Sequence, residues 1–448
     1  MTFTEFKEIV IAKAQAMGLT EYELYYQAAE STSVSAFKHE INQFTASTEG
    51  GVCFRCIVGG KMGYASTEEL SEAQAISVVE KAADNATVLE SEEQVFLGEG
   101  GKVYRTPEVK RYDLPATDAL IDKVLGTMEQ LYAADPCVVD GCSTQGFSET
   151  SSIAIVNSKG LDLYSSVSMA GLVVGAMVSD GKEKTNDYQI KLGALDAIDT
   201  DALTRKAAET ALAKLGGEVA PTGQYSVVFD PEAMSDLLQT FCGVFNSEAA
   251  QKGLSRFAGQ EGAVVAAPVV TLMDDPFHPQ SPIPRGFDAE GSPTCTKAVI
   301  EKGQLKTLLY NLKTAAVAGK QTTGNASKAG YDAPVGIRPF TMYLAGGELT
   351  EEELLAKAGN GVYINSLSGL HAGADPISGD FSLQSAGFMI ENGVKTRAVK
   401  SFTVAGNFYD LLKNIQAVAS NVELPSAMGT TNFGAPSVLV QGLTVAGK

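Results

Sequence analysis

The chain has only three histidines, and they lie too far apart in sequence to form the histidine-pair zinc site of a metallopeptidase helix. They are His39, His278 and His371. Such a helix carries two histidines about one turn apart, so that both imidazoles face one ion. The sequence therefore excludes a site of that kind on any helix of this chain.

One segment does bring candidate metal ligands together. Asp274, Asp275 and His278 lie in a short stretch that also contains two prolines, and two carboxylates with one imidazole could bind a cation. Proline-flanked loops with acidic residues are common on protein surfaces, so a solvated loop is the favoured interpretation. The sequence shows no G-x-S-x-G nucleophile elbow and no phosphate-binding loop. A serine–histidine–acid constellation built from distant residues stays open, but no pattern predicts one, and we assign no catalytic residue.

Six cysteines are spread along the chain, and two of them form a C-x-x-C pair, Cys53 and Cys56. Redox and zinc pairs of this kind sit where both sulfurs converge, at a turn or a helix start. The segment around them has the pattern of a strand, on which residues three apart point to opposite faces. We therefore expect buried thiols in a reducing compartment. The other four are Cys137, Cys142, Cys242 and Cys295.

The charge balance excludes direct binding of nucleic acids. The 448 residues include 34 basic and 53 acidic side chains, which gives a formal charge of −19. A surface this acidic repels phosphate backbones, and no stripe of lysine and arginine offsets it. The sequence has no apolar run long enough to cross a membrane, and charged residues interrupt its first apolar segment. A cytoplasmic location is therefore expected.

The first 220 residues predict a domain in which helices accompany antiparallel strands. Apolar residues at helical spacing predict helices over 3–17, 70–83, 120–131 and 203–215. Ser66 and Glu69 have the spacing of a capping box for the second of these helices. Strands are expected over 34–41, 43–47, 52–58, 153–156, 161–167 and 168–179, with turns at Thr48–Gly51 and Asn157–Gly160.

Pro221 and Gly223 mark the expected boundary with a second domain, 221–448, which is rich in short strands and glycine turns. Two segments, 299–303 and 389–393, have the pattern of a hairpin, and Asn392-Gly393 is typical of a type I′ turn. These features predict a mostly antiparallel barrel or sandwich, so the fold class of the whole chain is α+β. The helices expected in this half cover 231–245, 313–320, 351–358 and 408–419.

The most distinctive part of the second half is a set of polar residues and glycines at the ends of strands. Glycine is expected where backbones must approach closely, and Asp380 and Asn407 could cap local backbone groups. For each residue taken singly, a structural role and a binding role stay equally open. The set consists of Gly379, Asp380, Gly387, Glu391, Asn392, Gly393, Gly406 and Asn407.

Taken together, these residues resemble the C-terminal block of the TldD/PmbA family of peptidases, which are also called modulators of DNA gyrase. The segments 37–67 and 156–160 are similar to earlier parts of the same family. Its TldD branch binds zinc through an H-E-x-x-x-H helix and a later cysteine, and its PmbA branch, also called TldE, lacks these ligands. The segment 231–245, at the position of the zinc helix, has no histidine, and 423–429 has no cysteine. The resemblance is therefore to the PmbA branch.

The resemblance implies a cytoplasmic subunit that binds no cofactor itself and assembles with a zinc-containing TldD-like partner. The pair would enclose a chamber in which unfolded peptides are degraded or trimmed; a homodimer is the other assembly left open. Two further hypotheses remain. One is a stand-alone hydrolase with a site near Asp274, Asp275 and His278. The other is a module that binds gyrase or another protein without proteolysis.

Overall fold

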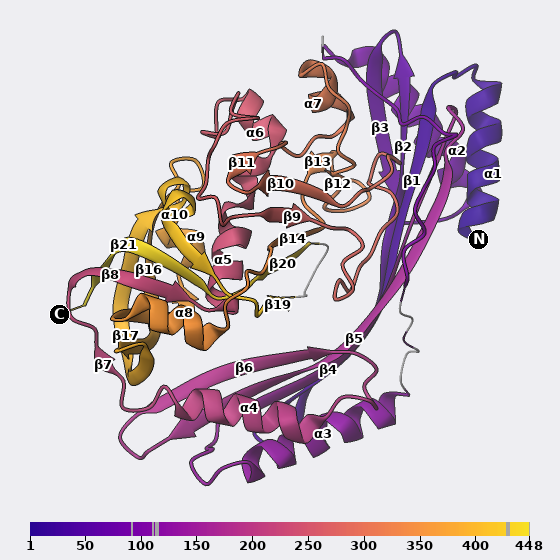
Figure 1. The fold of residues 1–448 in the computed structure, drawn as a ribbon. Coiled ribbons are helices and arrows are strands. Elements are labelled where there is room, and N and C mark those ends of the chain that lie inside the picture. Colours follow the sequence, from indigo (N-terminus) through magenta and orange to yellow (C-terminus); the bar gives the residue numbers. More distant parts are fainter. Residues whose placement is uncertain (91–92, 110–111, 113–115, 427–430, 448) are drawn as a thin grey trace.

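The chain forms an N-terminal part built on one long sheet and a C-terminal part built around a closed barrel (Figure 1). The structure is a computed structural model that describes residues 1–90, 93–109, 112, 116–426 and 431–447. Helices and mostly antiparallel strands occur in both parts, so the α+β fold class is confirmed. None of the helices in these residues is long and apolar enough to cross a membrane.

The N-terminal sheet has six antiparallel strands in the order β3-β2-β1-β4-β5-β6. Its central strands are two to three times as long as a typical strand of five or six residues. A sheet this long can carry separate hydrophobic cores along its length. The strands are β1 (Tyr22–Phe37), β2 (Glu40–Val58), β3 (Lys61–Thr67), β4 (Ser143–Asn157), β5 (Asp162–Ser179) and β6 (Lys184–Leu192).

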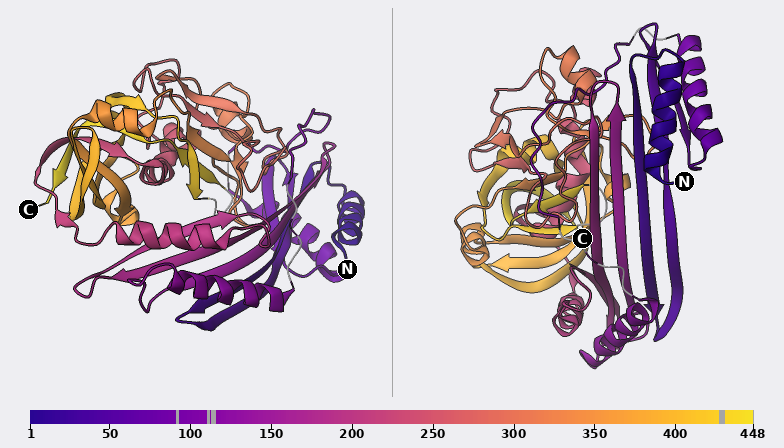
Figure 2. Two further views of the ribbon diagram at one scale, coloured as in Figure 1. Left: turned by 60° about the horizontal axis from the view of Figure 1, so that its bottom comes forward. Right: turned by 90° about the vertical axis from the view of Figure 1, so that its right-hand side faces the viewer.

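Two pairs of helices cover the two ends of this sheet. Helices α1 (Phe3–Ala16) and α2 (Glu72–Val88) pack on one end, around Phe6 and Phe54. Helices α3 (Thr117–Ala133) and α4 (Thr200–Leu212) pack on the other. Figure 2 (right) shows that the C-terminal part covers the sheet face opposite α1 and α2. Side chains alternate along a strand, so neighbouring residues of β1 enter different cores.

The turn predicted at Thr48–Gly51 is wrong, because β2 runs through these residues without a break. The chain instead reverses at Lys38 and His39, which have φ of 52° and 70°. The glycines are needed for close approach: a Cβ on Gly50 would lie 2.5 Å from the carbonyl oxygen of Gln27. A Cβ on Gly51 would lie 2.7 Å from the ring of Tyr331 in the C-terminal part. Gly50 and Gly51 are therefore required for close contact with neighbouring segments and not for a turn.

The predicted hairpin at Asn157–Gly160 is confirmed, and the predicted capping box is wrong. The Asn157 carboxamide oxygen accepts hydrogen bonds from the backbone N–H groups of Lys159 (3.0 Å) and Leu161 (3.1 Å). Helix α2 begins after Ser71, whose hydroxyl accepts from the N–H of Gln74. Ser66 instead lies within β3, where pairing with β2 holds it extended.

The predicted barrel is confirmed in the C-terminal part. Strands β21, β8, β15, β16 and β17 pair in that order, and β17 pairs again with β21 to close the ring. The strands of this sheet are β7 (Glu218–Val219), β8 (Gly223–Phe229), β15 (Gly361–Ser368), β16 (Asp380–Glu391), β17 (Val394–Asn407), β18 (Ile415–Val418) and β21 (Val438–Ala446).

A second sheet, in the order β11-β10-β9-β14-β20-β19, packs beside the barrel around α5. Its strands are β9 (Leu272–Asp274), β10 (Lys297–Glu301), β11 (Gln304–Leu305), β14 (Thr341–Leu344), β19 (Glu423–Ser426) and β20 (Asn432–Ala435), and β12 (Ala326–Ser327) pairs separately with β13 (Gly336–Ile337). The helical elements are α5 (Pro231–Phe241), η1 (Cys242–Phe245), α6 (Ser247–Gln251), α7 (Leu312–Val317), α8 (Glu351–Ala358), α9 (Leu370–Gly373) and α10 (Phe408–Asn414).

The helix predicted over 408–419 is too long. It ends at Asn414, because the next residues form β18 and pair with β21.

Both predicted hairpins are present. Lys302 and Gly303 have φ of 47° and 84°, and Asn392 and Gly393 have φ of 54° and 81°, as a type I′ turn requires at its two central residues.

Candidate functional site: helix α5 and the polar clusters around it

Helix α5 is anchored in the C-terminal core by an apolar stripe. Asp230 caps it by accepting a hydrogen bond from the N–H of Ala233 (2.8 Å), and Pro231 occupies the first turn, where its missing N–H costs nothing. Leu237 and Phe241 are fully buried, and the helix packs against β15, β19 and β20. The position of α5 is therefore fixed by its core-facing side.

The other side of α5 presents two carboxylates one helical turn apart. Glu232 is solvent-exposed, yet desolvation by the surrounding protein and repulsion from Asp236 and Asp187 raise its pKa to about 7. Burial raises the pKa of Asp236 to about 6. Asp187 belongs to β6 of the N-terminal sheet, where it pairs with Lys214 at 2.7 Å. Glu232 therefore lies near Asp187 and Lys214 of the N-terminal part, whose charges shift its pKa in opposite directions.

The three histidines lie elsewhere. His39 is in the β1–β2 turn rather than on a strand as predicted, where its Nδ1 lies 2.9 Å from Glu129. The His278 ring meets Tyr343 edge to face, and its Nδ1 accepts a hydrogen bond from the N–H of Gln280. His371 lies on the short helix α9, not in a loop as predicted. None of them is on α5.

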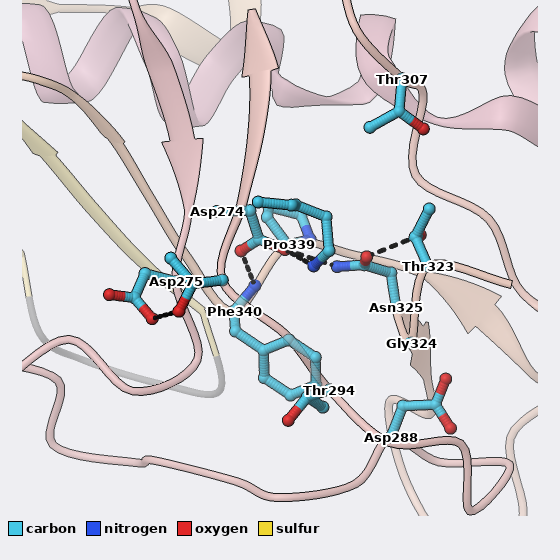
Figure 3. Close-up of polar contacts among 12 residues, drawn as sticks. Asp274, Asp275, Asp288, Thr294, Thr307, Thr323, Gly324, Asn325, Pro339 and Phe340 are labelled. Carbon is cyan, nitrogen blue, oxygen red and sulfur yellow. Dashed lines mark hydrogen bonds and ion pairs between the residues drawn. The ribbon is translucent and has the colours of Figure 1, made fainter. Parts of the chain in front are cut away.

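Asp274 and Asp275 face different surroundings and do not converge with His278. Asp274 is fully buried, and its Oδ2 accepts from Lys297 (3.0 Å) and Asn325 (2.7 Å), while its Oδ1 accepts from the N–H of Phe340 (2.8 Å) (Figure 3). Asp275 accepts instead from Thr296 at 2.6 Å. In the parts of the chain that the structure describes, no three histidine, cysteine, aspartate or glutamate side chains are placed to hold a metal. Asp274 serves a structural network that joins β9, β10 and the loop before β14.

Asp380 and Asn407 face each other at the ends of β16 and β17. The Asn407 amide donates to Asp380 Oδ1 (2.7 Å) and to the carbonyl oxygen of Ser378 (2.9 Å). The Asn407 oxygen accepts from the N–H of Tyr409, which caps α10. Gly379 has φ of 80°, and a Cβ there would lie 2.5 Å from the Tyr409 ring. These residues stabilise a loop at the end of the barrel.

The other motif residues close the barrel itself. A Cβ on Gly387 would lie 1.8 Å from the carbonyl oxygen of Tyr363 in the neighbouring strand. A Cβ on Gly406 would lie 2.7 Å from a methyl group of Leu443. Glu391, Asn392 and Gly393 form the end and turn of the β16–β17 hairpin. The contacts of the motif thus build the fold, and none points to a ligand.

The six cysteines are free thiols. Cys53 and Cys56 lie on β2 as expected, with Cys56 in the core under α1 and α2. Cys53 lies on the other face, close to Lys328 of the C-terminal part. Burial raises the pKa of both thiols, to about 11 for Cys56. Neither a C-x-x-C redox site nor a C-x-x-C metal site is formed.

A buried cluster of charges between the two parts was missed by the sequence analysis. Arg55 of β2 pairs with Glu23 of β1 at 2.6 Å, on the sheet face that meets the C-terminal part. Glu290 lies close to Arg55, and burial together with repulsion from Asp288 raises its pKa to about 7. The Asn157 amide donates to Glu23 at 3.1 Å. These residues are distant in sequence, so only the three-dimensional pairing of the strands reveals the cluster.

The fold, a long antiparallel sheet joined to a closed barrel, is that of a protein family known from several relatives. The chain belongs to the PmbA/TldD family: residues 22–86, 113–215 and 222–447 match the descriptions PmbA/TldA metallopeptidase domain 1, central domain and C-terminal domain. A metalloprotease of Methanothermobacter thermautotrophicus is 26% identical over 88% of this chain and 87% of its own length. A metalloprotease PmbA homolog of Haemophilus influenzae is 25% identical over 93% of this chain and 90% of its own.

Solved structures agree with this assignment. A Thermotoga maritima protein, named for a proposed role as a modulator of a DNA gyrase, has a TM-score of 0.89 and 32% identity, covering 99% of this chain and 100% of its own. TldE from Thermococcus kodakarensis has a TM-score of 0.87 and 23% identity, covering 98% of this chain and 99% of its own, and shows the fold alone.

Proposed function

We propose that this chain is the PmbA/TldE-type subunit of a cytoplasmic metallopeptidase, that it carries no zinc ligands, and that a TldD-like partner supplies the metal. The main support for the proposal is the set of side chains on the accessible face of α5. The family resemblance assigns the zinc ligands to this helix, but here Glu232 and Asp236 occupy its accessible side. Zinc-binding helices rely on neutral imidazole ligands, and two carboxylates with raised pKa values do not replace them.

The same geometry supports a role in holding peptide substrates. The proposed substrate is an unfolded peptide that binds beside α5, near Asp187 of β6. The outer edge of β6 pairs with no other described strand. An extended peptide could add to such an edge through backbone hydrogen bonds, which recognise a strand with little regard to its sequence.

A reconstitution experiment tests the proposal. We expect the purified chain to contain no stoichiometric zinc and to cleave no unfolded peptide alone. Mixing with a TldD-like subunit should produce peptidase activity above that of the partner alone, with a 1:1 complex in size-exclusion chromatography coupled to light scattering. Stoichiometric zinc or activity in the isolated chain would contradict the proposal.

Further experiments test the other hypotheses. If the isolated chain is active and His278→Ala abolishes that activity, the result would support a stand-alone hydrolase instead. Asp236→Asn should leave the isolated chain inactive and metal-free. A pull-down that recovers gyrase but no peptidase subunit would favour the gyrase-binding hypothesis over the peptidase subunit.

A further inference from the structure

A cavity of about 50 Å³ lies where β1 of the N-terminal sheet meets the C-terminal part. Among the described residues of its wall are three cationic side chains, Arg285, Lys328 and Arg338, and one carboxylate, Asp288. Three of the residues that line the cavity, Asp288, Pro339 and Phe340, are drawn in Figure 3 together with the Asp274 network. A positively charged cavity is unexpected in a chain with a formal charge of −19.

Asp288 contributes one negative charge to the wall, and backbone N–H groups fix its position. Oδ1 accepts hydrogen bonds from the backbone N–H groups of Glu290 and Ser292, each at 2.9 Å. Oδ2 accepts from the N–H of Ala326 at 3.0 Å. The carboxylate shapes the loop that forms the cavity wall, and one carboxylate against three cations leaves the described wall residues with an excess of positive charge.

Among the described residues, none forms a hydrogen bond or ion pair with the guanidinium of Arg285 or of Arg338. Arg338 is exposed to solvent, whereas Arg285 is half-buried and desolvation lowers its pKa, so Arg285 has the greater need of an anion. Lys328 donates to the carbonyl oxygen of Tyr331 (2.6 Å) and lies 4.5 Å from the centre of the Tyr25 ring. A desolvated cation without a counter-ion is unfavourable, so the cavity is poised to bind an anion.

We propose that this cavity is a binding site for a single carboxylate of a peptide or small organic acid. Guanidinium presents a planar fork of N–H donors that matches the two oxygens of a carboxylate. The volume exceeds the ~10–15 Å³ that a cavity needs to hold one water molecule and leaves room for a carboxylate group. The rings of Tyr25, Phe287 and Phe340 line the cavity and would contact the carbon atoms next to the carboxylate. This inference concerns the chain alone and does not require the peptidase assembly.

Thermal unfolding with defined ligands tests the site. The probes are tetra-alanine with a free C-terminus, the same peptide amidated, acetate and inorganic phosphate, at ionic strength matched with sodium chloride. We expect the free-acid peptide and acetate to raise the Tm of the wild-type protein in a saturable way and the amidated peptide to have no effect. A response to acetate and phosphate but not to the peptide would support the oxyanion site and identify its ligand as a free anion.

The variant Arg285→Gln separates binding from folding. Removal of an uncompensated cation should leave the Tm without ligand unchanged or higher, and the apparent affinity for the carboxylate should fall at least tenfold. Arg285→Lys should retain partial affinity. Arg205→Gln, on the exposed face of α4, is the matched control and should respond like the wild type. Equal responses to free and amidated peptide, unchanged binding in Arg285→Gln, or no response to any probe would overturn the proposal.

Discussion

At the scale of single residues, Glu290 connects pH to stability. Its pKa of about 7 lies above the ordinary value of 4.5, so the folded state holds this proton more tightly than the unfolded state does. The resulting stabilisation is complete below about pH 4.5 and is lost as the pH rises through 7. Glu290→Gln does not titrate, and its amide oxygen can still accept from the N–H of Leu312, as Glu290 does at 2.8 Å.

We therefore expect the unfolding free energy of Glu290→Gln, measured relative to that of the wild type, to increase from pH 5 to pH 8. The expected increase is on the order of 1–3 kcal/mol. Urea unfolding at both pH values measures the difference. Glu80→Gln, which alters an exposed ion pair with Lys13, is the control and should show little pH-dependent difference. Parallel stability profiles for Glu290→Gln and the wild type would refute this assignment.

Asp274 supports a second prediction, because it is the counter-ion of a nearly buried lysine. Asp274→Asn leaves Lys297 without a charged partner and should cost roughly 2–4 kcal/mol in unfolding free energy. The neighbouring Asp275→Asn should cost less than about 1 kcal/mol, because Asp275 is partly exposed. If Asp274 instead bound a metal, divalent cations would stabilise the wild type and not the variant, so unfolding is compared with and without EDTA.

At the scale of secondary-structure elements, two glycines predict opposite effects of substitution by alanine on stability. Gly387→Ala places a Cβ against the backbone of Tyr363, so β15 and β16 must separate, and we expect a loss of roughly 2 kcal/mol or more. Gly126 lies in α3 with open space around it and an ordinary helical φ, so Gly126→Ala should stabilise by ~0.5–1 kcal/mol. Denaturant unfolding of both variants checks the signs; stabilisation by Gly387→Ala would contradict the close contact.

Glycines in turns and glycines at close contacts between strands differ in how well the sequence predicts them. Asn392-Gly393 was predicted correctly because a type I′ turn is specified by its own two residues. Gly50 and Gly51 were misinterpreted because their role depends on Gln27 and Tyr331, which no local pattern reveals. The same limit applies to the site. The absence of histidine from α5 could be inferred from sequence, but the cavity around Arg285 requires segments that are far apart along the chain.

At the scale of the whole molecule, an apolar cluster joins the C-terminal part to the N-terminal sheet. It combines Ile153 and Ile155 of β4 with Phe287 and Ala326 of the C-terminal part, and Ile155 is fully buried. The same sheet carries Asp187, which lies near Glu232 of α5. The contact therefore helps to place β6 beside α5, where the proposed peptide binds.

Truncation of this contact should uncouple the two parts. Ile155→Ala removes apolar contacts at the interface and should cost roughly 2–4 kcal/mol. We expect differential scanning calorimetry to show a single transition for the wild type and two separated transitions for Ile155→Ala. The matched control is Val79→Ala, on the core-facing side of α2. It lowers stability without changing the interface between the two parts, so its calorimetric scan should still show one transition. A single transition in Ile155→Ala, with the activity gained from a TldD-like partner unchanged, would show that other contacts hold the two parts together.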